Sequence, residues 1–236
     1  DDQARRVLVI KDEGYQIDNI PLSEAEHNLI KQELKIKVNP EEAITATETV
    51  IAYGTYNQAQ RAWLWYTPPQ LIQDTLKERI QQDCIGASLE QYQVQNLDNL
   101  NLPVVLRYSF KGPEYFIPAG NLRIFPQLVS WDSSVVAKER RRYDIDFGYL
   151  YTQKVYYEIE IPAGFLIKYI PDNLTEDNPW FKFNVEYNYH DRKIYLVQSM
   201  QLKKDRVLKE EYPNFKPCFE NLAKKVKQRI ILQKIK

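Results

Sequence analysis

The sequence has few of the residues on which most enzymatic sites depend. Its 236 residues include only two histidines, two cysteines and seven glycines. A phosphate-binding loop needs glycines at fixed spacing so that the backbone can wrap around the anion. A dinucleotide or P-loop site is therefore not expected. The 13 prolines, together with Asn and Asp, must form many of the turns that glycine would otherwise supply.

Long apolar runs and a leader-like start are missing as well. A membrane-spanning helix needs about 18 or more consecutive apolar residues, and no stretch reaches that length. We therefore predict no membrane span. The first six residues, DDQARR, have neither the cationic start nor the apolar centre of a signal peptide. This favours either a cytoplasmic protein or the mature or truncated product of a longer chain.

The net charge is zero, but the charges are unevenly distributed. Residues 1–100 hold nine Lys and Arg against sixteen Asp and Glu, whereas residues 203–236 hold eleven against four. A basic tail can bind nucleic acid by neutralising phosphates. Here the basic residues surround regularly spaced apolar positions, and no aromatic residues alternate with them. We interpret the tail as a solvated face and expect no nucleic-acid partner.

Two segments, 154–161 and 181–189, are apolar at every second position. In the first, Val155, Tyr157, Ile159 and Ile161 alternate with polar residues. A period of two indicates half-buried strands, because successive side chains leave opposite faces of a pleated backbone. Many such short strands favour a mainly β fold that is antiparallel and β-sandwich-like. The strands are expected at 7–10, 28–38, 43–53, 102–110, 115–117, 122–129, 143–149, 154–161, 181–189, 194–203 and 229–235.

Helical spacing interrupts these strands twice. Apolar residues at 56–66 and 71–80, with a helix start at Thr67-Pro68, predict a helical insert near 56–83. A second stripe at 215–226 predicts a short C-terminal helix. We expect a domain boundary at Gly86, with a small β domain with helices at 1–86 and a β-sandwich domain at 87–236 that ends in the helix and a strand.

Loops are expected between these elements. Residues 11–25 are interpreted as a polar connection after the first strand. His190 to Lys193 are expected to form a four-residue hairpin loop between the strands on either side.

Nucleophilic catalysis would have to use the few histidines and cysteines. A nucleophile needs a base that touches it and a third group that orients the base. Nothing in the spacing brings His27 or His190 to Cys84 or Cys218. We interpret the histidines as a strand-entry residue and a turn residue, and the cysteines as free core thiols, although a fold could still bring the two thiols together. No catalytic residue is predicted.

Acidic residues offer two further hypotheses. Asp172, Glu176 and Asp177 could supply oxygen ligands, but a polar loop between prolines explains them more simply, so we expect no metal and no cofactor. Glu158 and Glu160 share one strand face and could form the carboxylate pair of an unrecognised glycosidase. Their lysine and tyrosine neighbours favour a solvent-facing stripe instead.

Aromatic residues are abundant, with 17 tyrosines and four tryptophans. Most fall on the inward side of the predicted strands, where they would fill the core. Trp131 and Trp180 stand where strands begin or end. They are the candidate binding residues for an alternative function, recognition of carbohydrate or peptidoglycan by exposed aromatic rings.

Several short motifs carry a family likeness. They are Arg142-Tyr143, Tyr157-x-Ile-x-Ile-Pro-x-Gly164, Ile170-Pro171, Tyr187-x-Tyr189 with Ile194, the run from Glu211-Tyr212 to Phe219, and Gly54 followed by Tyr56 and Arg61. Taken together, they span most of residues 7–236. In these motifs the chain resembles the C-terminal β region of bacterial exported transglutaminase-like proteins.

The resemblance implies an accessory role rather than an enzymatic one. Proteins of that kind carry an N-terminal β domain, a papain-like transglutaminase core and then a β region of unknown function. The catalytic Cys, His and Asp belong to the core, and no matching trio occurs here. The resemblance therefore implies a non-catalytic module, extracytoplasmic in location, that packs on or presents substrate to a transglutaminase-like or protease-like core in the same polypeptide or in a partner. A glycan or peptide is a further possible ligand.

Overall fold

The computed structural model describes residues 2–129 and 131–235, so Asp1, Ser130 and Lys236 lie outside the described residues. It confirms the mainly β fold with helices near 56–83 and near the C-terminus. The helices are α1 (Gly54–Tyr66), α2 (Pro69–Asp83) and α3 (Tyr212–Lys225), and a 3₁₀ turn spans Ser134–Val136.

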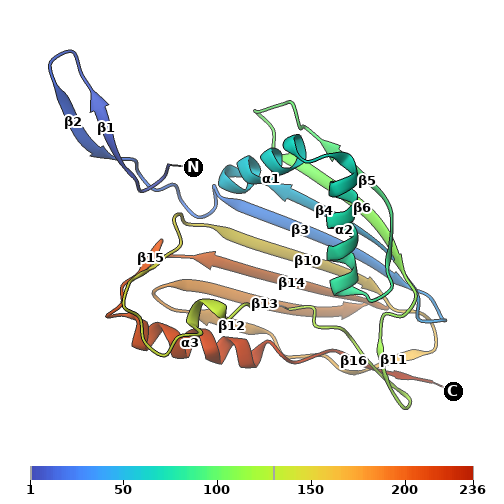
Figure 1. Cartoon of the computed structure of the whole chain (residues 1–236). Coiled ribbons are helices and arrows are strands. Elements are labelled where there is room, and N and C mark those ends of the chain that lie inside the picture. The colour runs from blue at the N-terminus through green and yellow to red at the C-terminus, as the bar shows by residue number, and fades with distance from the viewer. Residues whose placement is uncertain (1, 130, 236) are drawn as a thin grey trace.

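Among the described residues, the strands form one large sheet and three small ones. The large sheet contains eight strands in the order β12, β13, β14, β10, β3, β4, β6, β5 (Figure 1). Its strands are β3 (Leu29–Val38), β4 (Ile44–Ala52), β5 (Ser88–Gln95), β6 (Val104–Gly112), β10 (Thr152–Glu160), β12 (Leu174–Asp177), β13 (Phe181–His190) and β14 (Lys193–Leu202). One small sheet pairs β1 (Arg6–Ile10) with β2 (Tyr15–Asn19), and another pairs β9 (Ile145–Asp146) with β15 (Arg206–Val207). The third contains four strands, β7 (Ile117–Ala119), β8 (Leu122–Ile124), β11 (Phe165–Tyr169) and β16 (Ile231–Lys234).

One pairing in the large sheet departs from the antiparallel prediction. Strands β3 and β10 run parallel, with Leu29 opposite Thr152 and Lys37 opposite Glu160. A parallel pair needs a long crossover, and the chain between these two strands is long enough to include β4, β5, β6 and the first two helices. The other neighbours in this sheet are antiparallel.

The eight-stranded sheet also crosses the predicted domain boundary at Gly86. Strands β3 and β4 precede this glycine, but they pair with β10 and β6, which follow it. The units predicted at 1–86 and 87–236 therefore share one sheet. The local sequence predicted where the helical insert ends. It could not predict the pairing of β3 with β10 and of β4 with β6, because that pairing depends on residues far apart in the sequence.

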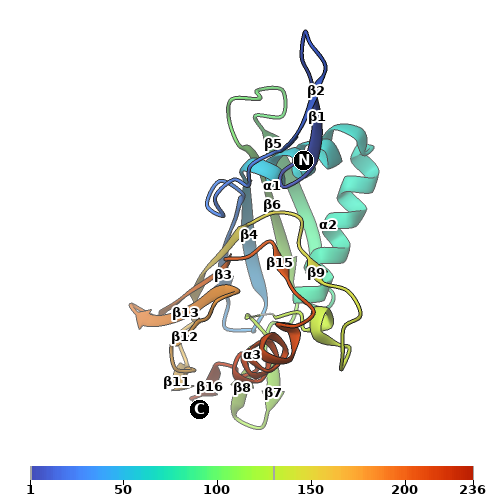
Figure 2. The same cartoon turned by 90° about the vertical axis from the view of Figure 1, so that its left-hand side faces the viewer.

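The helices cover one face of this sheet. Side chains of one register row, from Ile194 through Ile159, Ile36 and Ala46 to Phe110, point to that face and are buried. Helix α2 packs Ile72, Leu76 and Ile80 into the same core. Figure 2 shows α2 and α3 on the same side of the sheet, which leaves the other side uncovered.

A second core lies under α3. Phe215, Phe219 and Leu222 of this helix pack with Phe181 and Phe183 of β13. The rings of Phe215 and Phe219 lie 5.1 Å apart, and those of Phe181 and Phe219 lie 5.5 Å apart in an edge-to-face arrangement. Burial of each such side chain contributes about 1.5–3 kcal/mol, which explains the alternation that the sequence shows at 181–189.

The N-terminal hairpin projects from the body of the molecule (Figures 1 and 2). We predicted its first strand, but residues 15–19 form a second strand, β2, and not a polar connection. The turn between them contains Gly14 at φ 89°, a left-handed conformation that glycine adopts readily. Tyr15 and Ile17, each followed by a polar residue, carried the signal for this strand.

Several expected loops and strands differ in length. The hairpin between β13 and β14 has a two-residue loop, Asp191 and Arg192 at φ 51° and 58°, in place of the predicted four-residue loop. Two positive φ angles match the twist of a tight hairpin. The strands predicted at 122–129 and 143–149 shorten to β8 and β9, and part of the loop expected at 172–177 forms the edge strand β12.

Within the described residues, no helix is long and apolar enough to cross a membrane.

Candidate functional site

The uncovered side of the eight-stranded sheet, here called the open face, is polar along almost every register row. One row runs from Tyr195 through Glu158, Lys35, Thr47 and Ser109 to Gln91. The next runs from Val197 through Tyr156, Glu33, Thr49 and Arg107 to Gln93. These positions alternate with the buried positions of the same strands, so the sheet geometry itself sorts polar from apolar residues.

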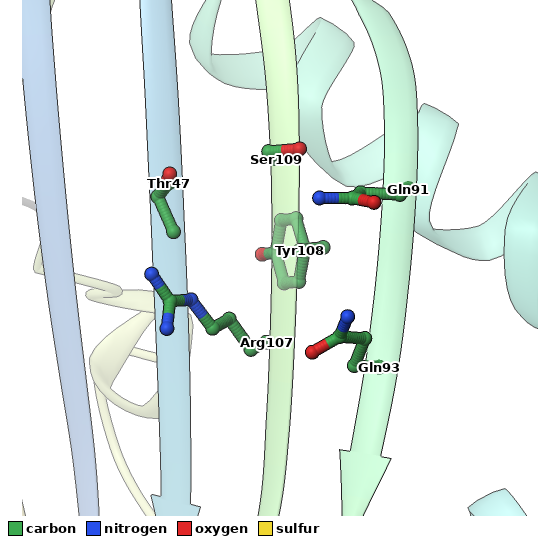
Figure 3. A pocket seen from close by; sticks show the side chains of 6 residues that line it. All are labelled: Thr47, Gln91, Gln93, Arg107, Tyr108 and Ser109. Carbon is green, nitrogen blue, oxygen red and sulfur yellow. The ribbon is translucent and has the colours of Figure 1, made fainter.

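A hollow of about 240 Å³ lies on this face over β4, β5 and β6 (Figure 3). Thr47, Arg107 and Ser109 line it together with Gln91 and Gln93. Tyr108 borders the hollow but is 3% exposed, because its side chain leaves the strand on the covered side. The lining combines amide, hydroxyl and guanidinium groups. It offers both hydrogen-bond donors and acceptors, as a polypeptide backbone requires.

A second hollow of about 320 Å³ continues the first over β3 and β10 and includes Lys35, Lys37, Glu158 and Glu160. Charges of opposite sign pair across these strands. The Lys193 ammonium donates to Glu158 at 2.6 Å, Lys35 lies 3.9 Å from the same carboxylate, and Lys37 lies 3.5 Å from Glu160.

This pairing shifts the pKa values of Glu158 and Lys193 in opposite directions. The hydrogen bond from Lys193 holds the pKa of the Glu158 carboxyl below its usual range. The same contact raises the pKa of Lys193. A general acid in a glycosidase needs a carboxyl whose pKa is raised. Glu158 has the opposite shift, and so the hypothesis of a Glu158 and Glu160 carboxylate pair gains no support from this geometry.

The covered side contains a buried acid, Glu48, whose pKa shifts in the opposite direction to that of Glu158. Glu48 on β4 is 7% exposed, and its carboxylate accepts hydrogen bonds from Tyr108 Oη at 2.5 Å and Gln32 Nε2 at 3.3 Å. Burial raises the pKa of this carboxyl, while the Tyr108 hydrogen bond acts in the other direction. Burial raises the pKa of Tyr108 as well. No approach to Glu48 from solvent is apparent among the hollows described, so we assign it to the core.

The two tryptophans proposed for binding lie in the core under α3. Trp180 is 7% exposed, which contradicts the expected exposure, and its ring packs 5.6 Å from Phe215. Trp131 is half-buried. Its Nε1 donates to the carbonyl of Phe219 at 3.2 Å, and its ring packs against Phe181, Phe183 and Phe219. Neither ring forms an open platform, so the glycan hypothesis loses the residues on which it rested.

The histidines and cysteines stay apart from one another. Cys84 is buried in the core under α2 and donates to the carbonyl of Glu114 at 3.4 Å, while Cys218 packs against the core under α3. Both thiols are free, as predicted. His27 is exposed, and His190 stacks on Tyr195 at the hairpin end of the sheet. Burial raises the pKa of the Cys84 thiol, which makes it a weaker nucleophile at neutral pH.

Two of the three acidic residues considered as metal ligands, Glu176 and Asp177, lie beside lysines. Lys225 lies 3.5 Å from Glu176, and Lys203 pairs with Asp177. In the part of the chain that the structure describes, no group of three or more His, Cys, Asp and Glu side chains is arranged to hold a metal ion.

The residues behind the family likeness have structural roles. Gly54 has φ 55°, and a Cβ there would lie 2.4 Å from both the His27 carbonyl oxygen and Asn28 Oδ1. The guanidinium of Arg61 donates to the carbonyls of Asn96, Asn99 and Leu102, which fixes the loop between β5 and β6. Gly54 and Arg61 therefore fix the local backbone at the start of α1 and between β5 and β6.

Reasoning from the sequence missed two surfaces. The open face depends on register across six strands, and local alternation alone could not align Thr47 with Ser109 and Gln91. The exposed aromatic residues were also misplaced, because Trp65 and Tyr66 at the end of α1 are 54% and 82% exposed. The sequence did carry a signal for this exposure. Trp65 and Tyr66 are adjacent on a short amphipathic helix, and adjacent residues cannot both lie on its narrow buried face.

Comparisons with known proteins found a match to one family model and a similarity to a solved structure. Residues 121–232, from β8 to β16, match the model of a domain of unknown function with a solved structure, DUF3858. A solved structure from Parabacteroides distasonis ATCC 8503, described as a "putative protease", is similar over 92% of this chain and 29% of its own length, with 9% identity and a TM-score of 0.42. The chain thus spans less than a third of that protein. No curated protein matches the chain.

Proposed function

We propose that this chain is a non-catalytic accessory β module of a larger exported protein, and that it packs on or presents substrate to a transglutaminase-like or protease-like catalytic core. The observation that carries the proposal is the open face, a broad polar surface on which Glu158 and Glu160 pair with lysines of the neighbouring strands. General acid and base catalysis needs a group whose pKa lies near the working pH. The pairs shift the pKa of Glu158 and Lys193 away from neutrality.

The hollow over β4, β5 and β6 suits a polypeptide. Gln91 and Gln93 each carry a donor and an acceptor, and Thr47 and Ser109 carry hydroxyls that can act as either. Arg107 adds a planar cation that fits a carboxylate. The motif likeness to the β region of exported transglutaminase-like proteins supports the same role and the extracytoplasmic location.

An activity assay tests the non-catalytic part of the proposal. The 236-residue chain is incubated with fluorogenic peptide amides for hydrolysis, and with an amine and a glutamine peptide for acyl transfer. We expect no turnover above that of buffer. Turnover that disappears in Cys84→Ala or Cys218→Ala, with folding retained by circular dichroism, would overturn the proposal.

Glycan binding is a second candidate, on a different surface from the one predicted. The exposed Trp65 and Tyr66 end α1, and Leu71, which is 55% exposed, follows near the start of α2. Exposed aromatic rings of this kind can stack on sugar rings. Quenching of tryptophan fluorescence by peptidoglycan fragments, retained in Trp131→Phe and lost in Trp65→Ala, would favour this candidate. Unchanged fluorescence would remove it.

A further inference from the structure

The β1–β2 hairpin has one apolar face that nothing in the structure covers. Its register pairs Leu8 with Ile17 and Ile10 with Tyr15, and paired residues point to the same side. These four side chains are 59%, 65%, 81% and 71% exposed, respectively. The opposite face carries Gln16 and Asp18 beside two valines, so the hairpin is amphipathic.

Hydrogen bonds close the base of the hairpin, and Gln3 links it to the body of the protein. The backbone N–H of Ser23 donates to Gln3 Oε1 at 2.8 Å, and Gln3 Nε2 donates to Thr55 Oγ1 at 3.4 Å. Backbone hydrogen bonds between Ala4 and Ile20 and between Ile20 and Arg5 continue the ladder. The hairpin is thus directed away from the sheet (Figures 1 and 2).

A two-stranded hairpin is marginally stable alone in water, and neither edge of this one pairs with another strand of the described residues. Exposed strand edges and contiguous apolar faces are features that soluble proteins usually cover. An apolar face on a fixed, projecting hairpin therefore indicates a partner surface.

The area of this face distinguishes between possible partners. Four side chains of this size present roughly 400 Å² of apolar area, so a symmetric pair of hairpins from two copies would bury roughly 800 Å² in total. That is the size of a crystal contact and about half of a standard stable interface. The same area falls within the range of interfaces between domains of one chain, where the covalent link gives an effective concentration near millimolar.

We propose that the apolar face of the β1–β2 hairpin docks on a folded domain joined to this chain in the same polypeptide. This inference rests on the proposed function and identifies that domain as the catalytic core. Leu8, Ile10, Tyr15 and Ile17 form the contact, and the free edges of β1 and β2 are available to pair with a strand of the core.

Hydrogen exchange tests this inference with two polypeptides, the 236-residue chain and the natural polypeptide that contains it. Amides in residues 6–10 and 15–19 are expected to exchange at least tenfold more slowly in the longer polypeptide. Leu8→Thr with Ile17→Thr, which keeps strand propensity, should abolish that protection. Gln16→Thr on the opposite face should leave it intact.

The contrary results separate the two proposals. If the natural polypeptide holds a folded core and the hairpin amides exchange equally fast in both polypeptides, the docking inference fails while the accessory function stands. If the natural polypeptide has no further folded domain, both fail. The isolated chain should sediment as a monomer. A dimer that the paired Thr variant dissociates would assign the hairpin to a second copy and overturn the inference.

Discussion

The two faces of the eight-stranded sheet contain glutamates with opposite properties. Glu48 points to the covered face, where burial raises its pKa, and Glu158 points to the open face, where Lys193 lowers its pKa. Both residues lie on central strands of the same sheet, separated only by β3. The two residues are both glutamates of one sheet, so the face to which each side chain points accounts for the opposite shifts of their pKa values.

The covered face and the open face should also respond differently to substitution. On the covered face each side chain is fixed by packing, so its substitution changes stability. On the open face the side chains touch mainly one another and solvent, so their substitution should change binding with little effect on the fold. The predictions below test this division, beginning with the largest effect.

Adjacent residues of β6 should give the largest difference between the faces. Phe110 is 2% exposed under α2, whereas Ser109 points to the open face. Phe110→Ala should lower the free energy of unfolding by about 3–5 kcal/mol, because it removes apolar contacts and leaves a cavity. Ser109→Ala should change it by less than about 0.5 kcal/mol. Urea denaturation measures both, and equal losses would show that the open face is covered after all.

Replacing Glu48 should have an intermediate effect, in the stabilising direction at neutral pH. Its raised pKa means that the folded state holds the proton more tightly than the unfolded state. The stability that this provides is complete below the unfolded pKa and is lost as pH rises through the folded value. Glu48→Gln removes the ionisation, and Tyr108 can still donate to the amide oxygen while the Gln32 amide reverses to accept.

We therefore expect Glu48→Gln to raise the free energy of unfolding by on the order of 1 kcal/mol at pH 7. The gain should shrink towards zero as pH falls to about 4. Thermal unfolding at several pH values measures it, with Gln32→Glu as the companion variant that places a second, half-buried acid beside Glu48 and should destabilise. A gain that grows as pH falls would show that folding lowers the pKa of Glu48 instead of raising it.

The sequence predicted which residues of several strands face the core, but it did not predict how the strands pair into one sheet. Alternation at 154–161 and 181–189 predicted which residues face the core, since the period of two is a local property. The helices near 56–83 and 215–226 followed from local spacing in the same way. The parallel pairing of β3 with β10 joins residues 123 positions apart, and the pairing of β4 with β6 across Gly86 joins residues at least 52 positions apart. No local pattern encodes contacts at such separations.

The candidate site was predicted less well for the same reason. Trp180 was expected at a strand end and therefore at the surface, but its position at the entry to β13 directs it beneath α3, next to Phe215. Three strands must be in register before Arg107, Gln93 and Thr49 become neighbours. Polar alternation indicates that each strand has a solvent side, and only the register shows that these sides combine into one surface.

The smallest effect should come from Glu158 on the open face. Because its pKa is lowered, its contribution to stability is present above the unfolded pKa and is lost as pH falls through the folded value. Glu158→Gln should lower the free energy of unfolding by about 0.2–1 kcal/mol at pH 7 and low salt, as is usual for accessible ion pairs. The loss should vanish in about 1 M NaCl, where screening acts over a few ångströms, and at low pH. A loss that persists in high salt would mean that this carboxylate is buried against something, and the open face would then be part of an interface already formed.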